Sequence, residues 1–230
     1  IETAVDAMKN GATDFLAKPL NVAQLEKSLQ RACEIVAMRR ELEHYRESQV
    51  KSINFVVGSN DVVKTTVKQS LVAAERQVSV LITGETGTGK DVIAKFIHAS
   101  GPRANKPFIA INCAAIQDTM LESELFGHEA GAYTSAERKK PGLMEIADDG
   151  VLFLNEISSM SADIQAKLLS AIETHSFRRV GGTALINVDV QVLAASNRDL
   201  KEMIRKGEVR EDLYYGLKVV DLDMPPLRER

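Results

Sequence analysis

The feature that most constrains this chain is a glycine-rich turn set between an apolar run and a helical segment. Residues 84–90, GETGTGK, fit the pattern G-x-x-x-x-G-K and directly follow the apolar run at residues 78–83. A segment at helical period begins at Asp91. A strand, a glycine-rich turn and a helix in this order direct backbone N–H groups and the positive end of a helix dipole to one point. The pattern therefore predicts a loop that binds the phosphates of a nucleotide.

The predicted loop consists of Gly84, Glu85, Thr86, Gly87, Thr88, Gly89 and Lys90. We expect Lys90 to neutralise the β and γ phosphates of ATP. Asp91 stands where a Ser or Thr hydroxyl usually binds Mg²⁺. The alternative is a glycine-rich turn with an exposed lysine, but the position between a strand and a helix favours an ATP site.

Two further apolar runs end in polar side chains. Residues 150–156, GVLFLNE, are similar to a Walker B strand, which usually ends in an Asp that holds the Mg²⁺ water shell and a Glu that polarises the attacking water. Because Asn155 replaces that Asp, we expect weak metal binding through water, with Glu156 as the base. Residues 190–197 end in Asn197, which would hold the attacking water or the γ-phosphate. The alternatives are a core strand that meets a loop and, for Asn197, a turn residue.

Apolar runs alternate with segments at helical period from residue 55 onward. The runs cover residues 78–83, 108–111, 151–154, 190–195 and 219–224, and the helical segments cover residues 91–99, 121–126 and 162–173. Strands of a parallel sheet are almost continuously apolar because helices cover both of its faces. The order predicts a doubly wound α/β domain with a parallel sheet.

The composition excludes several other kinds of site. A formal charge of −3 gives no basic excess for holding DNA, so we expect any DNA-binding module to lie outside this chain. The 2 cysteines and 4 histidines lack metal-ligand spacing. No apolar run approaches the roughly 20 residues that span a bilayer, and no signal pattern is present. We expect a reduced, cytoplasmic protein without structural zinc and without a membrane partner.

Residues 22–47 contain neither glycine nor proline and carry two apolar seams at helical spacing. The phase shift between the seams predicts one long helix whose second half faces a different partner, such as a second copy of the chain in a short coiled coil. An amphipathic linker that packs within its own chain fits equally well. Since the chain begins at Ile1 and stops at Arg230 without a closing element, we expect a piece of a longer protein.

Several motifs together resemble the NtrC-type AAA+ activators of sigma-54 RNA polymerase, which are bacterial enhancer-binding proteins. They are the phosphate-binding loop with an acidic residue after its lysine, INCAA at 111–115, ELFGHE at 124–129, RVGG at 179–182 and PPLRER at 225–230. The resemblance covers nearly the whole chain. It implies an AAA+ P-loop NTPase that assembles as a ring, with ATP bound between subunits, and that remodels the sigma-54 polymerase.

The resemblance also implies roles for two segments. The loop of Gly131, Ala132, Tyr133, Thr134, Ser135 and Ala136 resembles the GAFTGA loop that contacts the sigma factor. We expect an exposed Tyr133 on a small loop, although a tyrosine that folds back is the alternative. Ser135 replaces a glycine, which predicts a stiffer loop tip. Asn112 of INCAA is implied to be a switch that grips Glu156.

Residues 210–216, REDLYYG, match the segment that supplies arginine fingers to the neighbouring subunit's ATP in that family. Arg210 is the expected first finger, whereas Gly216 occupies the position of the second and has no charge. An arginine finger contributes a factor of about 10³ to 10⁵ in rate, so Gly216 and Asn155 predict reduced hydrolysis. One alternative is a degenerate scaffold that binds ATP with little turnover. The other is a metabolic P-loop kinase, which leaves the loop at 131–136 without a role.

Residues 1–21 resemble the last third of a two-component receiver domain, with Lys18 near the phosphorylated aspartate. For Lys18 the alternative is an ordinary turn lysine. The resemblance implies a helical linker at residues 22–50 that supports a dimer, and an ATPase domain at residues 51–230 without its helical lid. It further implies a sensor histidine kinase that acts through the receiver, and a DNA-binding C-terminal domain absent here.

Overall fold

The computed structural model describes residues 25–30, 60–133, 136 and 138–229. The chain divides into two compact units, Ile1–Gln49 and Val50–Arg230. In the first unit residues 25–30 are helical, and Leu29 is exposed there. The rest of the helix predicted at residues 22–47, the receiver segment and Lys18 lie outside the described residues. Those expectations therefore stay predictions.

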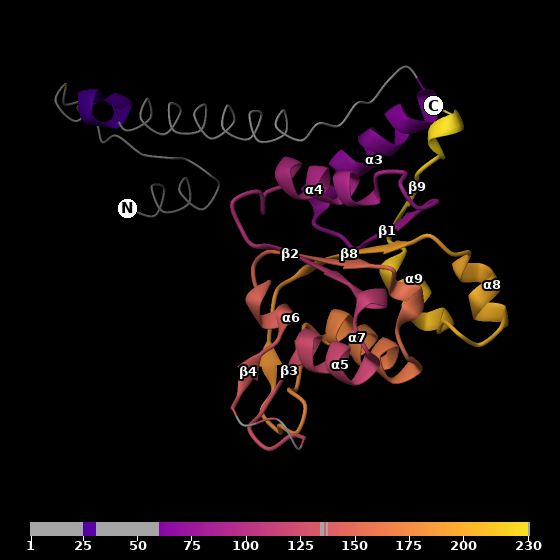
Figure 1. The fold of residues 1–230 in the computed structure, drawn as a ribbon. Coiled ribbons are helices and arrows are strands. Elements are labelled where there is room, and N and C mark those ends of the chain that lie inside the picture. Colours follow the sequence, from indigo (N-terminus) through magenta and orange to yellow (C-terminus); the bar gives the residue numbers. More distant parts are fainter. Residues whose placement is uncertain (1–24, 31–59, 134–135, 137, 230) are drawn as a thin grey trace. The chain divides into compact units, whose positions relative to one another are not determined.

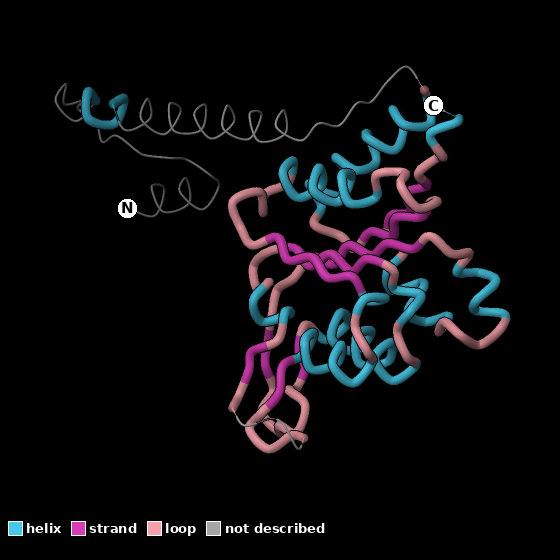
Figure 2. The backbone as a smooth tube through the Cα atoms, viewed as in Figure 1, coloured by secondary structure: helices cyan, strands magenta, loops and turns pink. Residues whose placement is uncertain are grey.

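A parallel sheet forms the centre of the second unit (Figures 1 and 2). Its five strands are β1 (Val80–Thr83), β2 (Phe108–Asn112), β5 (Val151–Asn155), β8 (Gln191–Ser196) and β9 (Val220–Asp223). They lie in the order β2-β5-β8-β1-β9, and every pairing is parallel. Each of the five apolar runs in the sequence forms one of these strands, so the prediction of a parallel sheet is confirmed.

The apolar runs are continuous because alternate residues of each strand enter two different cores. In β5, Leu152 and Leu154 pack into one core, whereas Val151 and Phe153 pack into the other. The strands β1 and β8 divide their residues in the same way. A strand with one face in water would alternate apolar and polar residues instead. The central strands are therefore buried on both faces, as a doubly wound fold requires.

Helices cover both faces of the sheet, as Figure 1 shows. One face carries α3 (Asp61–Arg76) and α4 (Lys90–Ser100). On the other side lie α5 (Asp118–Phe126), α6 (Leu143–Ile146), α7 (Ala162–Thr174), α8 (Leu200–Arg205) and α9 (Glu211–Leu217). The predicted doubly wound α/β class is confirmed.

Short elements complete the described part of the chain. Strand β3 (Gly127–His128) pairs with β4 (Lys140–Pro141), and β6 (Ser176–Phe177) pairs with β7 (Ile186–Asn187), both antiparallel. The 3-10 turns are η1 (Cys113–Ala115), η2 (Ile157–Ser159) and η3 (Leu227–Glu229). Directly after β2 and β5, η1 and η2 fix the direction in which the chain leaves the sheet.

The helix α3 has no counterpart among the helices predicted from sequence. It begins at Asn60, whose side-chain oxygen accepts hydrogen bonds from the backbone N–H of Val62 and Val63 at 2.8 and 3.3 Å. Its buried face includes Thr66 and Ser70, whose hydroxyls donate to carbonyls one turn earlier. Polar residues at core positions weaken the apolar period.

None of the described helices is long and apolar enough to cross a membrane.

We predict that Gly150→Ala destabilises the fold strongly. A Cβ at Gly150 would lie 2.2 Å from the backbone oxygen of Pro107. That oxygen accepts the hydrogen bond that starts β5, from the N–H of Val151 at 2.8 Å, so it cannot move away freely. We expect a loss of roughly 3 kcal/mol or more in the free energy of unfolding, measured by urea denaturation.

Gly207→Ala is the matched control. Gly207 has φ of 73°, but a Cβ there would meet nothing within 4 Å. It should therefore lose only the cost of the left-handed backbone, about 1 kcal/mol. Equal losses in the two variants would contradict the collision at Pro107.

Candidate functional site

The glycine-rich loop connects β1 to α4 and encloses its lysine. Gly84, Gly87 and Gly89 have φ of 149, 84 and 89°, a region that residues with a Cβ rarely adopt. The Lys90 ammonium donates hydrogen bonds to the carbonyls of Gly84 at 2.9 Å and Glu85 at 3.0 Å. Lys90 is only 6% exposed. The loop therefore holds a positive charge inside a turn of backbone, beside a helix N-terminus that favours anions.

The loop is pressed against the chain that follows β9. The N–H of Met224 donates to the carbonyl of Thr83 at 2.8 Å. A Cβ at Gly84 would lie 2.6 Å from the Met224 oxygen, so no other residue fits there without movement. On the outside of the loop, Arg228 forms a two-pronged ion pair with Glu85 at 2.7 and 2.8 Å. This hydrogen-bonded pair lowers the pKa of the Glu85 carboxyl.

The strand ends bring the predicted base and sensor to the loop. One carboxylate oxygen of Glu156 accepts a hydrogen bond from the backbone N–H of Asn197 at 3.3 Å. The Asn197 side-chain amide donates to the hydroxyl of Thr86 at 3.1 Å. The carboxyl ends of β5 and β8 and the turn after β1 therefore meet in one network. Three of the predicted site residues come together as the sequence indicated.

Glu156 adopts a backbone conformation that is uncommon for its residue type. Its φ is 56° and its ψ is 51°, in the left-handed region. A non-glycine residue held there costs on the order of 1–3 kcal/mol and occurs preferentially at functional sites. The Glu156 carboxylate reaches the loop after β8, where it accepts the hydrogen bond from Asn197. Glu156 is thus placed for a role beyond packing.

Asn155 is the last residue of β5, and its side chain faces the first turn of α4. Its amide nitrogen donates to a carboxylate oxygen of Asp91 at 3.4 Å. Its side-chain oxygen is buried and has no hydrogen-bond partner within the described part of the chain. Both side chains line a recess of about 270 Å³ that also contains Asn112 and Lys95. The residues at the predicted metal position are therefore a carboxylate and an acceptor oxygen, the ligand types that Mg²⁺ takes.

Asn112 has a different partner from the one that the family resemblance implied. It is level with Asn155 in the sheet, but its side-chain oxygen accepts from the N–H of Ala114 at 3.0 Å. The carboxylate of Glu156 accepts from Asn197 instead. Among the described residues, Asn112 and Glu156 make these contacts and not the implied one with each other. In this structure Asn112 caps η1.

A second recess, of about 480 Å³, adjoins the other side of the loop. Gly84, Glu85 and Asn197 line it, together with residues that the sequence did not single out. Among those are Tyr214, Lys218 and Asp221. Lys218 is hydrogen-bonded to the Tyr214 hydroxyl at 2.8 Å and paired with Asp221 at 2.7 Å, which raises the pKa of Lys218. Tyr214 lies within residues 210–216, the segment that the sequence related to arginine fingers, whereas Lys218 and Asp221 lie beyond it and carry no motif.

Arg210 lies at the N-terminal end of α9, where it lines a separate shallow recess together with Tyr215. Its guanidinium forms two hydrogen bonds with Asp212, at 3.0 and 2.7 Å. Gly216 lies within α9, and a Cβ there would meet a methyl of Leu169, on α7, at 2.9 Å. An arginine at residue 216 would therefore require Leu169 to shift.

Comparison with known proteins assigns this arrangement. The model of the family described as the sigma-54 interaction domain matches residues 56–223. The chain belongs to that family. The resemblance to NtrC-type activators is thereby confirmed, and so is the AAA+ P-loop NTPase fold.

Curated relatives match the whole chain. It is 43% identical over 232 residues to the regulatory protein AtoC of Escherichia coli and 43% identical over 230 residues to the regulatory protein LuxO of Vibrio cholerae. Both alignments cover 100% of this chain and 50% of the relative. The chain thus spans half the length of these two relatives.

A solved structure of NtrX from Brucella abortus in complex with ADP is also similar. It has a TM-score of 0.70 and 35% identity, and the match covers 100% of this chain and 51% of that one. Both sequence and structure therefore relate this chain to longer proteins.

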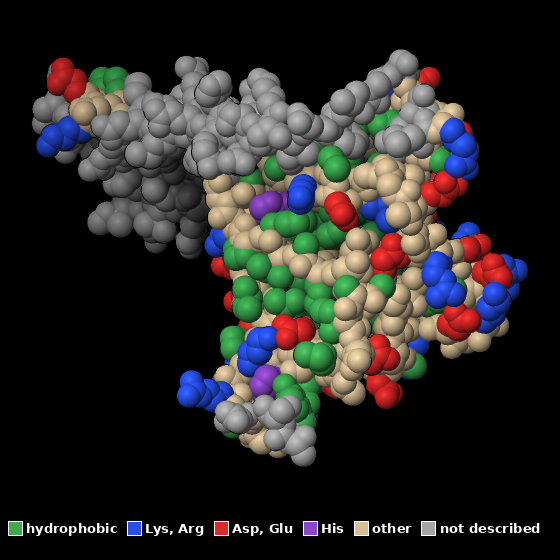
Figure 3. All heavy atoms as spheres, viewed as in Figure 1, with side chains coloured by type: hydrophobic (Ala, Val, Ile, Leu, Met, Phe, Trp, Pro, Cys, Tyr) green, Lys and Arg blue, Asp and Glu red, His purple; other side chains and the backbone are tan. Residues whose placement is uncertain are grey.

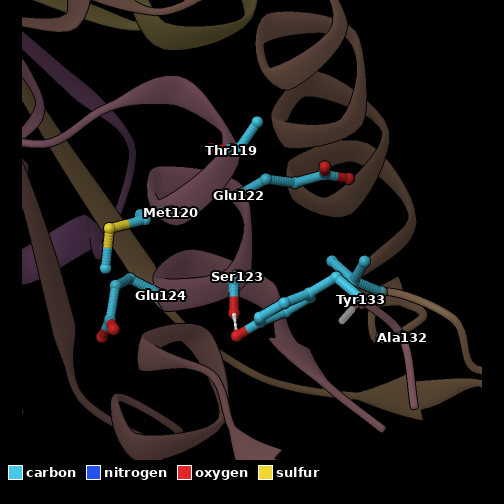
Figure 4. A pocket seen from close by; sticks show the side chains of 8 residues that line it. Thr119, Met120, Glu122, Ser123, Glu124, Ala132 and Tyr133 are labelled. Atoms are coloured by element: carbon cyan, nitrogen blue, oxygen red, sulfur yellow. Dashed lines mark hydrogen bonds between the residues drawn. The ribbon is translucent and has the colours of Figure 1, made fainter. Parts of the chain in front are cut away.

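The loop at residues 131–136 is the second candidate site of the sigma-54 interaction domain. The N–H of Gly131 donates to the carbonyl of Ala136 at 2.8 Å, which closes the loop. Tyr133 points back toward α5 rather than outward, as Figure 4 shows. Its hydroxyl lies 3.4 Å from Ser123 and 3.4 Å from His128, and its ring meets the His128 ring edge-on at 5.1 Å.

Tyr133 remains 42% exposed, so it is both accessible and anchored. Of the two possibilities for this tyrosine, the structure matches the one in which it folds back. Ser123 and His128 are themselves buried, and the Ser123 hydroxyl lies 2.7 Å from Nδ1 of His128. Thr134 and Ser135 lie outside the described residues, so the predicted effect of Ser135 stays a prediction.

Arg179 supports the base of this loop. Its guanidinium pairs with Glu129 at 2.7 Å and with both carboxylate oxygens of Glu145, one at 2.8 Å. These hydrogen bonds raise the pKa of Arg179 and lower that of Glu129. Next to it, Gly181 packs so closely that a Cβ there would lie 2.9 Å from the Cβ of Ala132. The RVGG segment thus fixes the loop where it leaves the domain.

The surface carries no single basic area on the face drawn in Figure 3, where Lys and Arg side chains are mixed with Asp and Glu. Hydrophobic side chains gather on that face between α4 and α6. The edge strand β2 contributes the partly buried Phe108 and Ile109. This distribution agrees with the net charge of −3 and gives duplex DNA no favourable field on this face.

We predict that the Cys113 thiol, next to Asn112, reacts very slowly in the folded protein. Burial, with a smaller contribution from the Glu156 charge, raises the pKa of Cys113 from about 9 to about 12. At about pH 8 its reactive thiolate fraction should be about a thousandfold below that of an ordinary cysteine. Alkylation by iodoacetamide should accelerate as the pH rises, and at once on denaturation in guanidinium chloride.

The measurement uses Cys33→Ser, which leaves Cys113 as the remaining cysteine. Mass spectrometry of timed samples gives the rate. Alkylation of the folded chain as fast as that of the denatured chain would show that Cys113 is not held in the core beside the site.

Proposed function

We propose that this chain is the ATPase module of a two-component response regulator that activates sigma-54-dependent transcription by remodelling the polymerase. The observation that supports it best is the network from Glu156 through Asn197 to Thr86 beside an enclosed Lys90. In a sigma-54 interaction domain, that network has the parts needed to position water against a terminal phosphate. The complex of the related NtrX with ADP supports a nucleotide in this loop.

Each residue has a defined task in this proposal. Lys90 would exchange its two carbonyl partners for the β and γ phosphates, since charged phosphate oxygens are better acceptors. Backbone N–H groups of the loop bind the remaining phosphate oxygens. Glu156 takes a proton from the attacking water, and Asn197 orients that water. Mg²⁺ would neutralise charge on the phosphates when it is bound with ATP, and Asn155 would contact its water shell.

Arg210 is proposed to act on the ATP of a neighbouring subunit in a ring. It lines a recess separate from those beside its own phosphate loop, which fits a role in trans. Its partner Asp212 would have to release it first. Because Gly216 provides no second arginine, hydrolysis should be slower than in a ring with two fingers.

We also propose that the remaining predicted parts belong to the longer protein. Since the chain covers half of relatives such as AtoC, the C-terminal part of a receiver at residues 1–21, a linker at residues 22–50 and a DNA-binding domain beyond this chain are compatible with their length. A sensor histidine kinase would phosphorylate the receiver. The linker would then control assembly of the domain at residues 51–230.

A second function, a scaffold that binds ATP with little turnover, is favoured by Asn155 and Gly216. Steady-state ATPase activity of the full-length protein with Mg²⁺ separates the two. We expect turnover clearly above that of Lys90→Ala, which loses phosphate binding. Glu156→Gln should keep ATP binding while it slows turnover by about 10²- to 10⁴-fold, because it removes the base. Turnover equal to that of Lys90→Ala, with ATP binding intact in the unmodified protein, would establish the scaffold.

The loop at 131–136 is proposed to contact the sigma factor through Tyr133. We predict that Tyr133→Ala abolishes sigma-54-dependent transcription and leaves ATP affinity unchanged, since Tyr133 lines neither recess beside the phosphate loop. Tyr133→Phe is the matched variant, because it keeps the ring and removes the contacts of the hydroxyl with Ser123 and His128. It should retain transcription. Full transcription with Tyr133→Ala would contradict the assignment of this loop.

A further inference from the structure

The contact between Asp91 and Asn155 joins the two positions at which this chain departs from the usual P-loop pattern. Asp91 follows the loop lysine, where a hydroxyl usually stands, and Asn155 ends β5, where a carboxylate usually stands. The Asn155 amide nitrogen lies 3.4 Å from a carboxylate oxygen of Asp91. In P-loop NTPases these two positions flank the Mg²⁺ ion. The strand end lacks a carboxylate here, but the helix beside it has one.

The orientation of the Asn155 amide follows from this contact. A carboxylate only accepts hydrogen bonds, so the amide must turn its nitrogen toward Asp91. That leaves its oxygen buried without a donor in the described part of the chain. A buried acceptor without a donor is unfavourable, and the water shell of a cation would supply one. The pair therefore fits a metal site better than it fits a closed hydrogen-bond network.

Asp91 is the carboxylate that lines the recess next to Asn155. Within the described residues it makes no ion pair, although Lys95 lines the same recess. Of the other nearby carboxylates, Glu85 pairs with Arg228, Glu156 accepts a hydrogen bond from the backbone N–H of Asn197, and Asp223 accepts one from the Thr83 hydroxyl. Across the loop, Asp221 pairs with Lys218. Mg²⁺ is usually held by one or two carboxylates together with the substrate phosphates, so one is enough.

We propose that Asp91 supplies the carboxylate for Mg²⁺ in this domain, and that Asn155 is its neutral partner, which holds the Asp91 side chain in place. Asp91, in the first turn of α4, thus takes the part that a carboxylate at the end of β5 usually has. Two carboxylates at this distance would repel each other, and the Asn155 amide avoids that repulsion while it donates a hydrogen bond. This proposal rests on the proposed function, because the ion arrives with the nucleotide.

Moving the carboxylate from residue 91 to residue 155, at the end of β5, tests the proposal. Full-length protein with ADP is titrated with Mn²⁺, and free Mn²⁺ is followed by electron paramagnetic resonance. We expect Asp91→Asn to weaken Mn²⁺ binding to the ADP complex roughly 10- to 100-fold. The double variant Asp91→Asn with Asn155→Asp, which returns the carboxylate to the strand end, should recover most of that loss. The single variant Asp91→Glu should bind Mn²⁺ nearly as tightly as the unmodified protein, since it keeps the negative charge.

Asp163→Asn, in the exposed first turn of α7, is the matched control and should bind Mn²⁺ as the unmodified protein does. Circular dichroism melting checks that each variant is folded. Unchanged Mn²⁺ binding in Asp91→Asn, or no recovery in the double variant, overturns the assignment of Asp91. Measuring ADP binding in the presence of EDTA separates a failure of the metal assignment from a failure of the nucleotide site. If the unmodified protein binds no ADP with or without metal, the nucleotide site itself is rejected and the metal assignment with it.

Discussion

The site depends on the parallel alignment of the central strands. Because β1, β5 and β8 run in the same direction, their carboxyl ends open at one edge of the sheet, and the residues that follow each strand meet there. The register pairs Thr83 with Ser196. Thr83 directly precedes the phosphate loop, and Ser196 directly precedes Asn197. A slip of one residue would turn the side chains of a whole strand to the opposite face. The two cores that fix the register of the strands thus also fix the positions of the site residues that follow them.

Charge at this edge is arranged so that few groups are unpaired. Lys90 donates to two carbonyl oxygens, Glu85 is held by Arg228, and the Glu156 carboxylate accepts a hydrogen bond from Asn197. The loop is therefore already formed without a bound phosphate. The partners of Lys90 are backbone dipoles rather than a carboxylate, and they give way to a phosphate more readily. This preorganisation lowers the cost of binding.

The sequence predicted the sheet, the phosphate loop and the family, because each leaves a local pattern. Contacts between distant residues leave none. Arg228 meets Glu85 across 143 positions, and nothing in either segment indicates the other. The helix α3 was missed because Thr66 and Ser70 occupy its core positions. The Asn112 contact depends on whether a side chain caps the next turn or reaches across, a choice between two nearby partners.

The position of Tyr133 has a consequence for selectivity in a crowded cell. Exposed aromatic rings on loop tips bind many surfaces weakly, and such binding competes with a true partner. Here the ring lies against His128 and its hydroxyl faces Ser123, so a surface that captures the ring must first replace those contacts. Brief encounters offer too little to do so. In the proposed contact, a partner must therefore offer packing and hydrogen bonding in place of those from His128 and Ser123.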